Sequence, residues 1–130
     1  MDKPTYKVII AGTRTFADYP LLCSSCDKYL SQKGQTHDII IVSGTARGAD
    51  RLGEQYASER GYQVQQFPAD WEKNGRAAGY MRNADMANYS DALIAFWDGQ
   101  SKGTLNMIKT ARKKGLAVRV VNYKNSTNNK

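Results

Sequence analysis

The fold is decided by an apolar run and the glycine-rich turn behind it, DIIIVSGTARGAD at residues 38–50. Residues 39–42 are apolar and β-branched without a break, which is typical of a strand buried on both faces of a parallel sheet. A helical pattern follows over residues 50–60, and Gly61 ends it. A buried strand, a glycine-rich turn and a helix together indicate one unit of an α/β domain.

The same pattern recurs on both sides of this unit. Further strands are predicted at residues 6–11, 62–67, 92–97 and 117–121, and further helices at 18–34, 76–89 and 104–114. The strand at 62–67 alternates in polarity, so we expect it half exposed near an edge. Right-handed crossovers place helices on both sides of such a sheet. We therefore predict an α/β fold: a single three-layer Rossmann-like domain with a mainly parallel five-stranded sheet over residues 1–123, and a polar tail at 124–130. The predicted inner positions of the helix at 76–89 are Tyr80, Met81, Ala84 and Ala87.

Length and composition exclude several classes of protein. The chain has 130 residues, of which 41% are hydrophobic and 24% charged, as in an ordinary single soluble domain. The longest apolar run, residues 92–97, is far shorter than the roughly 20 residues that cross a bilayer. Residues 1–7 lack the apolar segment of a signal peptide. We expect a cytoplasmic protein without a membrane partner.

Two cysteines, Cys23 and Cys26, have the spacing of a redox or metal motif. No second cysteine pair accompanies them, and His37 is the one histidine, so a zinc site lacks ligands. On a helix Cys26 continues an apolar stripe with Leu22 and Leu30. We therefore interpret both thiols as reduced packing residues, and we predict neither a metal nor a cofactor.

The net charge of +7 is concentrated at the carboxyl end of the chain. Residues 99–130 hold eight basic residues and no acidic one, whereas basic and acidic residues nearly balance in residues 1–98. A basic segment attracts phosphates or nucleic acid, and it is also typical of a solvated helix face and tail. Binding of single-stranded nucleic acid by residues 102–124 therefore remains an alternative hypothesis.

The turns that leave the predicted strands differ from those that enter them, because they collect glycines, hydroxyls and arginines. The carboxyl ends of parallel strands share one edge of the sheet, where ligands bind. Glycine lets backbone N–H groups approach an anion, helix N-termini attract it, and arginine clamps phosphate oxygens. The predicted ligand-binding residues are Gly12, Thr13, Arg14, Ser43, Gly44, Thr45, Arg47, Gly48, Asp50, Trp71, Arg76, Arg82, Asn83, Asp98, Gly99, Ser101, Gly103 and Thr104.

Several of these residues have a structural interpretation as well. Any single glycine can serve only a tight turn, and Asp50 can simply begin a helix. Trp71 lies on a longer polar loop and is predicted to stack on a base, whereas Tyr80 is expected to pack. For Trp97, packing and ligand contact both stay open. The usual glycine signatures of NAD-dependent dehydrogenases and P-loop ATPases are absent from the sequence.

Taken together, the motifs resemble the YspA-like group of the SLOG superfamily, which includes the DNA-processing protein DprA and the LOG phosphoribohydrolases. The resemblance covers residues 6–121 and rests on GTR at 12–14, SGTARGAD at 43–50, FPADW at 67–71, GRAAG at 75–79, RN at 82–83, FWDG at 96–99 and SKGT at 101–104. It implies a Rossmann-like domain that senses or processes a nucleotide or a nucleotide-derived small molecule.

The resemblance also implies two alternatives. LOG enzymes cleave the N-glycosidic bond of a nucleoside monophosphate with an arginine, which Arg82 matches, and a glutamate behind a Gly-Thr pair. Gly103 and Thr104 match that pair, but Met107 occupies the glutamate position, and a thioether is no acid or base. The weak catalytic candidates are thus Arg82 and Asp98. DprA-like proteins bind single-stranded DNA through a segment that Arg82 and Asn83 resemble, and self-association of LOG relatives suggests a homo-oligomer.

Overall fold

The computed structural model describes residues 3–124, so the predicted tail at 124–130, apart from Lys124, lies outside the described residues. It contains a five-stranded sheet in the order β3-β2-β1-β4-β5, and every neighbouring pair is parallel. This confirms the predicted fold class. The strands are β1 (Thr5–Gly12), β2 (Asp38–Ser43), β3 (Gln63–Gln66), β4 (Ala92–Trp97) and β5 (Ala117–Asn122).

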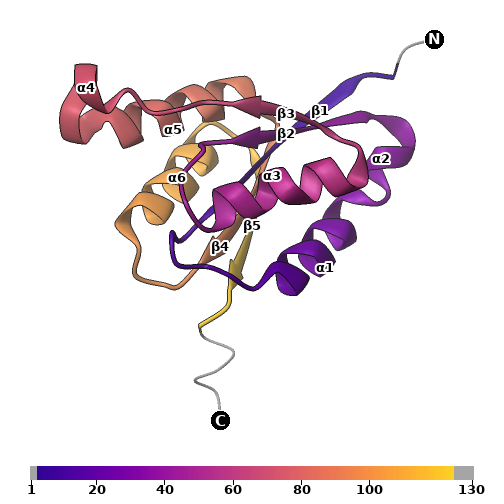
Figure 1. Cartoon of the computed structure of the whole chain (residues 1–130). Coiled ribbons are helices and arrows are strands. Elements are labelled where there is room, and N and C mark those ends of the chain that lie inside the picture. Colours follow the sequence, from indigo (N-terminus) through magenta and orange to yellow (C-terminus); the bar gives the residue numbers. More distant parts are fainter. Residues whose placement is uncertain (1–2, 125–130) are drawn as a thin grey trace.

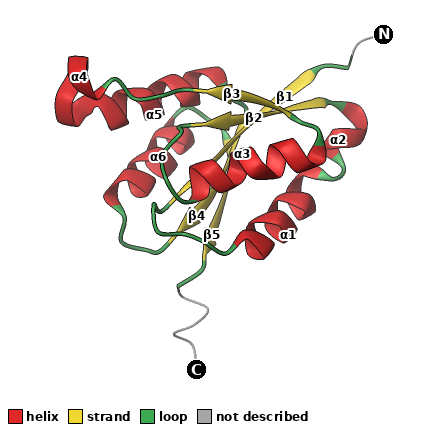
Figure 2. Ribbon diagram, in the orientation of Figure 1, coloured by secondary structure: helices red, strands yellow, loops and turns green. Residues whose placement is uncertain are grey.

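Helices cover both faces of this sheet, as Figures 1 and 2 show. Helices α1 and α3 pack on one face, and α5 and α6 pack together on the other. The helical segments are α1 (Tyr19–Leu30), α2 (Lys33–Thr36), α3 (Ala49–Arg60), α4 (Trp71–Asn74), the 3-10 turn η1 (Gly75–Ala77), α5 (Ala78–Tyr89) and α6 (Lys102–Lys113). The short segments α2, α4 and η1 were not predicted.

The two central strands hold the layers together. Val8 and Ile10 of β1 belong to the core on the α1–α3 side, and Ile9 and Ala11 belong to the core on the α5–α6 side. Successive side chains of a strand point to opposite faces, so one apolar run serves both cores. Each fully buried isoleucine contributes about 1.5–3 kcal/mol to folding. Strand β4 is likewise buried from Ala92 to Phe96.

The outer elements differ from the predictions in detail. Strand β3 lies at the predicted edge, but all four of its residues are exposed rather than half exposed. The predicted helix at 18–34 ends at Leu30, and Gly34 lies inside α2. Leu30 is the last residue of the buried stripe, so extending the helix into the polar residues beyond it would bury no further apolar side chain. Cys26 is fully buried in that stripe, and both cysteines are free thiols.

Helix α5 is rotated from its predicted orientation. Tyr80 and Met81 were predicted to face the core, but they are 51% and 48% exposed. Ala87 is buried as predicted, but the buried side also carries Asn83 and Met86. Asn83 Nδ2 donates to Asn106 Oδ1 of α6 at 2.9 Å. Because the Asn83 side chain is hydrogen-bonded to α6, it can be buried at a position where hydrophobic periodicity predicts an apolar residue.

Neither a membrane span nor a metal site was found in residues 3–124. No helix there combines the length and apolar character needed to cross a bilayer. No three side chains of the metal-ligating types His, Cys, Asp and Glu gather in that part of the chain.

Candidate functional site

The candidate site is a crevice at the carboxyl ends of β1 and β4, where the chain changes from one face of the sheet to the other. In open α/β sheets ligands bind at this point. Gly12 ends β1 here, and a Cβ built on it would lie 2.2 Å from the Phe96 carbonyl oxygen and 2.8 Å from the Ala49 Cβ. Only glycine lets β1, β4 and α3 approach so closely.

Two adjoining cavities occupy this crevice. The first has a volume of about 230 Å³ and is lined by residues from the end of β1, from the loops after β1, β2 and β4, and from α3, α4, η1, α5 and α6. The second, of about 390 Å³, lies against the loops after β2 and β3. Arg14, Ala46, Trp71 and Arg82 line both cavities. The glycine-bearing turns at residues 43–50 and 98–104 therefore meet at one site, although they are far apart in sequence.

Thirteen predicted ligand-binding residues line these cavities: Gly12, Arg14, Gly44, Thr45, Arg47, Asp50, Trp71, Arg76, Arg82, Asn83, Ser101, Gly103 and Thr104. Thr13, Ser43, Gly48, Asp98 and Gly99 lie outside both cavities and shape the loops around them. Their contacts explain the difference.

Asp98 organises the loop between β4 and α6. Its Oδ1 accepts hydrogen bonds from the backbone N–H groups of Ser101 at 2.8 Å and Gln100 at 2.9 Å. These bonds hold the pKa of the Asp98 carboxyl below its ordinary value. Thr13 Oγ1 accepts from the Asp98 N–H at 3.2 Å, which ties this loop to the end of β1. The Asp98 Oδ1 atom is thus occupied by its own loop, and the residue lines neither cavity.

The same loop presents the start of α6 to the first cavity. Ser101 caps the helix, since its Oγ accepts from the Thr104 N–H at 3.4 Å. Trp97 Nε1 donates to the Ser101 carbonyl at 3.0 Å, so this tryptophan packs under the loop. Gly103 and Thr104 line the cavity in the first turn, where free N–H groups and the helix dipole favour an anion.

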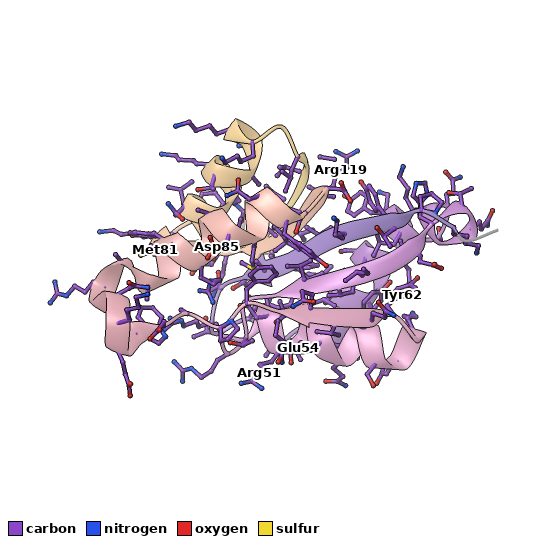
Figure 3. All side chains as sticks on the ribbon, turned by 90° about the horizontal axis from the view of Figure 1, so that it is seen from above. Arg51, Glu54, Tyr62, Met81, Asp85 and Arg119 are labelled. Carbon is purple, nitrogen blue, oxygen red and sulfur yellow. The ribbon has the colours of Figure 1, made fainter. Side chains whose placement is uncertain are left out.

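The turn between β2 and α3 is held in a strained conformation. Thr45 has φ +66°, which is costly for a β-branched residue. Ser43 Oγ accepts from the Thr45 N–H at 3.1 Å and donates to Glu54 Oε2 at 2.6 Å. Arg51 Nε of α3 donates to the Thr45 carbonyl at 3.0 Å. Figure 3 labels Arg51 and Glu54 on α3, across the sheet from Asp85 on α5. Side chains from α3 therefore hold this turn against the cavity.

Asp50 is a buried acid at the cavity wall. Its side chain is in the first turn of α3, and the residue is only 5% exposed. Oδ2 accepts from the Ala46 N–H at 3.1 Å. Burial raises the pKa of this carboxyl to about 6, although the Ala46 N–H, Arg82 and Arg14 each oppose the rise. A perturbed carboxyl in a cleft is a physical marker of a functional site.

Arg82 lies beside Asp50 and joins α5 to the β2–α3 turn. Its Nη1 donates to the Gly44 carbonyl, and its Nε donates to Asn83 Oδ1 at 3.1 Å. A Cβ on Gly44 would lie 2.7 Å from Arg82 Nη1 and 2.8 Å from Asp50 Oδ2. The missing side chain therefore lets both charged groups reach the turn. Burial lowers the pKa of Arg82, and Arg14 acts in the same direction.

The wall of the first cavity includes two half-exposed aromatic residues. Trp71 is 50% exposed and begins α4, and Tyr80 lies on α5. Tyr80 was missed as a site residue because it was assigned to the core. Arg76 and Tyr80 are four residues apart, a spacing that puts two side chains on one helix face, and this signal was available in the sequence. Met107 is 1% exposed and also lines the cavity, so this part of the wall carries a thioether and not a carboxylate.

Comparison with known proteins identifies relatives in sequence. Residues 6–74 match the model of the YspA, cpYpsA-related SLOG family, abbreviated YAcAr. The gene 61 protein of Mycobacterium phage D29 is 31% identical over 118 residues, which cover 86% of this chain and 93% of that protein. The match spans the cavity-lining turn at residues 43–50.

Solved structures share the fold at lower sequence identity. DprA from Streptococcus pneumoniae gives a TM-score of 0.68 at 17% identity over 91% of this chain, which spans 50% of DprA. TM1055 gives a TM-score of 0.62 at 20% identity, covering 87% of this chain and 72% of TM1055. The Moco carrier protein of Chlamydomonas reinhardtii gives 0.56 at 15% identity, covering 92% and 76% of the two chains. These likenesses concern the Rossmann-like fold alone.

Proposed function

The chain belongs to the YspA, cpYpsA-related SLOG family, and from this premise we propose that it binds a nucleotide or nucleotide-derived ligand at the carboxyl edge of its sheet. One observation carries the proposal. Three arginines, Arg14, Arg76 and Arg82, and the start of α6 surround one cavity of about 230 Å³. Guanidinium groups and a helix N-terminus are the partners that phosphate prefers.

The phosphate belongs at the first turn of α6 in this proposal. Gly103 offers its backbone N–H there and Thr104 its hydroxyl, whereas the Thr104 N–H is bonded to the Ser101 cap. Arg82 lies partly buried beside the cavity, where a charge-assisted hydrogen bond is stronger than at the surface. Arg14 is exposed and lines both cavities, so it can reach the ligand from the solvent side.

The base belongs against the aromatic wall. Trp71 and Tyr80 both line the first cavity, and each is about half exposed. Exposed aromatic rings at a cavity are surfaces on which bases can stack. Trp71 lies at the junction of the two cavities, so a base on its ring leaves the α6 turn free for phosphate.

Calorimetry with AMP, ADP-ribose and NAD tests this function. We expect at least one of them to bind, and Arg14→Gln to weaken its binding roughly tenfold, the effect of losing one charge-assisted hydrogen bond. Arg112→Gln is the matched control, because Arg112 lies in the last turn of α6, at the end away from the cavity. A folded protein that binds none of the three ligands would contradict the proposal.

Hydrolysis of an N-glycosidic bond is the second candidate function. Met107 speaks against the LOG route, but Asp50 supplies a carboxyl at the same cavity. With AMP bound, release of free adenine by the wild type and its loss in Asp50→Asn would establish hydrolysis. Intact AMP after prolonged incubation would leave a binding function without this reaction.

A further inference from the structure

The charged residues that line the two cavities are all basic except one. Arg14, Arg47, Arg76 and Arg82 are the basic ones, and Asp50 is the acidic one. A buried carboxylate repels a phosphate ligand, so its presence in an anion site opposes the main interaction. Such a group is compatible with tight binding only if the ligand also offers it hydrogen-bond donors.

The contacts of Asp50 leave room for such donors. Within residues 3–124 the Ala46 N–H is the one hydrogen-bond donor to this carboxylate, and it contacts Oδ2. Ser90 Oγ is the sole buried side-chain polar atom without a partner in that part of the chain. Oδ1 of Asp50 is therefore not sealed inside the protein, and the residue lines the first cavity. An ionised carboxylate has several acceptor sites, of which the protein occupies one.

Asp50 lines the same cavity as the proposed positions of the base and the phosphate. Its Oδ2 and Arg82 Nη1 both lie within 3 Å of the place of a Gly44 Cβ, and Arg82 is shared by the two cavities. The proposed phosphate position at α6 and the proposed base position at Trp71 lie on other walls of the same cavity. The group that connects a base to a phosphate is a sugar, and its free hydroxyls are donors.

We propose that Asp50 accepts hydrogen bonds from the ribose hydroxyls of the ligand and thereby selects phosphorylated ribose over 2-deoxyribose. This inference rests on the proposed function and narrows it to the sugar class. In dinucleotide-binding folds an acidic residue performs the equivalent task from a different place in the chain. Here the acid comes from the first turn of α3.

Four probes separate this inference from the function on which it rests: AMP, 2′-deoxy-AMP, ribose 5-phosphate and 2-deoxyribose 5-phosphate. We expect the wild type to bind each ribose compound roughly tenfold or more tightly than its deoxy counterpart, the effect of one hydrogen bond to a charged group. Asp50→Asn is expected to bring both ratios near one, while its amide oxygen still accepts the Ala46 N–H. Asp85→Asn, an exposed acid on α5, is the matched control and retains both ratios.

Each outcome decides the matter. Equal binding of ribose and deoxyribose compounds by the wild type overturns the inference and leaves nucleotide binding intact. A ratio that persists in Asp50→Asn also overturns it and leaves Asp50 as a support of the β2–α3 turn. Binding of the two sugar phosphates with the expected ratio, but of neither nucleotide, supports the inference and contradicts the proposed function. Binding of no probe overturns the inference, and it contradicts the proposed function as well when ADP-ribose and NAD also fail to bind. Thermal unfolding of Asp50→Asn without ligand shows whether the variant is folded.

Discussion

Gly48 is a residue at which one backbone angle decides how closely two loops approach. Its φ is +77°, and a Cβ there would lie 2.4 Å from the Thr13 carbonyl oxygen and 2.5 Å from that of Arg14. The Ala49 N–H donates to the same Thr13 carbonyl at 3.4 Å. The start of α3 is thus seated directly on the loop after β1, and this contact brings Arg14 to the cavity.

Replacing Gly48 by alanine is expected to destabilise the protein by about 3 kcal/mol or more, since strain from the positive φ adds to a backbone clash. Gly61→Ala is the matched control. Its φ is +76°, but nothing lies within 4 Å of its Cβ position, so we expect a loss of about 1 kcal/mol. Urea denaturation measures both values. Equal losses in the two variants would show that the close approach at Gly48 is unimportant.

Asp50 also makes stability depend on pH. Burial raises its pKa from the ordinary value of 3.8 to about 6, against the opposing effects of the Ala46 N–H, Arg82 and Arg14, while Glu54 adds to the rise. Between about pH 4 and pH 6 the folded state therefore holds a proton that the unfolded state releases. The contribution of Asp50 to the free energy of unfolding is constant below this window and falls as pH rises through it.

We expect the stability difference between wild type and Asp50→Asn to shift by about 2 kcal/mol against the wild type between pH 4 and pH 7. Urea denaturation at the two pH values measures it, and Asp85→Asn serves as the control for loss of one exposed charge. A difference that does not change with pH, or that grows in favour of the wild type, would show that the Asp50 carboxyl is not held neutral by burial.

At the scale of elements, α4 and η1 form a projection rather than part of a layer. They pack chiefly on each other and on α5, and Figure 1 shows α4 at the far end of the molecule, beyond the sheet. Asp70 caps α4, since its Oδ1 accepts from the Lys73 N–H at 3.1 Å. This projection carries Trp71 and Arg76 to the first cavity.

Trp71 is expected to report ligand binding by its fluorescence, because it is one of two tryptophans and the other, Trp97, is tied to Ser101. Trp71→Phe keeps a ring for stacking, so it should abolish the AMP-dependent change in fluorescence and leave affinity nearly unchanged. Trp71→Ala should lower the affinity for AMP by roughly 5- to 100-fold, the range for loss of one base-stacking ring. Ribose 5-phosphate has no base, and its affinity should be the same in all three proteins. An unchanged AMP affinity in Trp71→Ala would remove Trp71 from the site.

At the scale of the whole molecule, the basic residues at the end of α6 lie apart from the arginines of the cavity. Arg112 and Lys113 end α6 and Lys114 follows them, whereas the cavity lies at the first turn of the same helix. A helix of 12 residues is about 18 Å long, so this basic end is well separated from the proposed ligand.

The expectation of a homo-oligomer stays a prediction that light scattering tests.

The hypothesis of single-stranded DNA binding predicts a different phenotype from nucleotide binding. If the basic end of α6 contacts three phosphates, reversing Arg112, Lys113 and Lys114 to glutamate should lower the salt slope of DNA affinity by about 2. The affinity for AMP should stay unchanged, because the cavity is at the other end of the helix. DNA binding that is equal in the wild type and the triple variant would refute this hypothesis.

The sequence by itself determined the sheet, its flanking helices and the edge at which the turns gather. Strands such as residues 92–97 are apolar throughout, and local patterns of this kind need no knowledge of distant residues. Turn chemistry is local as well, so the glycine-bearing segments at 43–50 and 98–104 were recognisable.

The tertiary structure alone decided which side chains those turns present to the cavity. Asp98 was a catalytic candidate in the sequence, yet its Oδ1 is occupied by its own loop and it lines neither cavity, while Asp50 lines the first one. Tyr80 entered the cavity wall because Asn83 took the buried position on α5. The exposure of Tyr80 depends on contacts of Asn83 with residues 20 or more positions away, and such contacts are set by packing and hydrogen-bond satisfaction that no local pattern encodes.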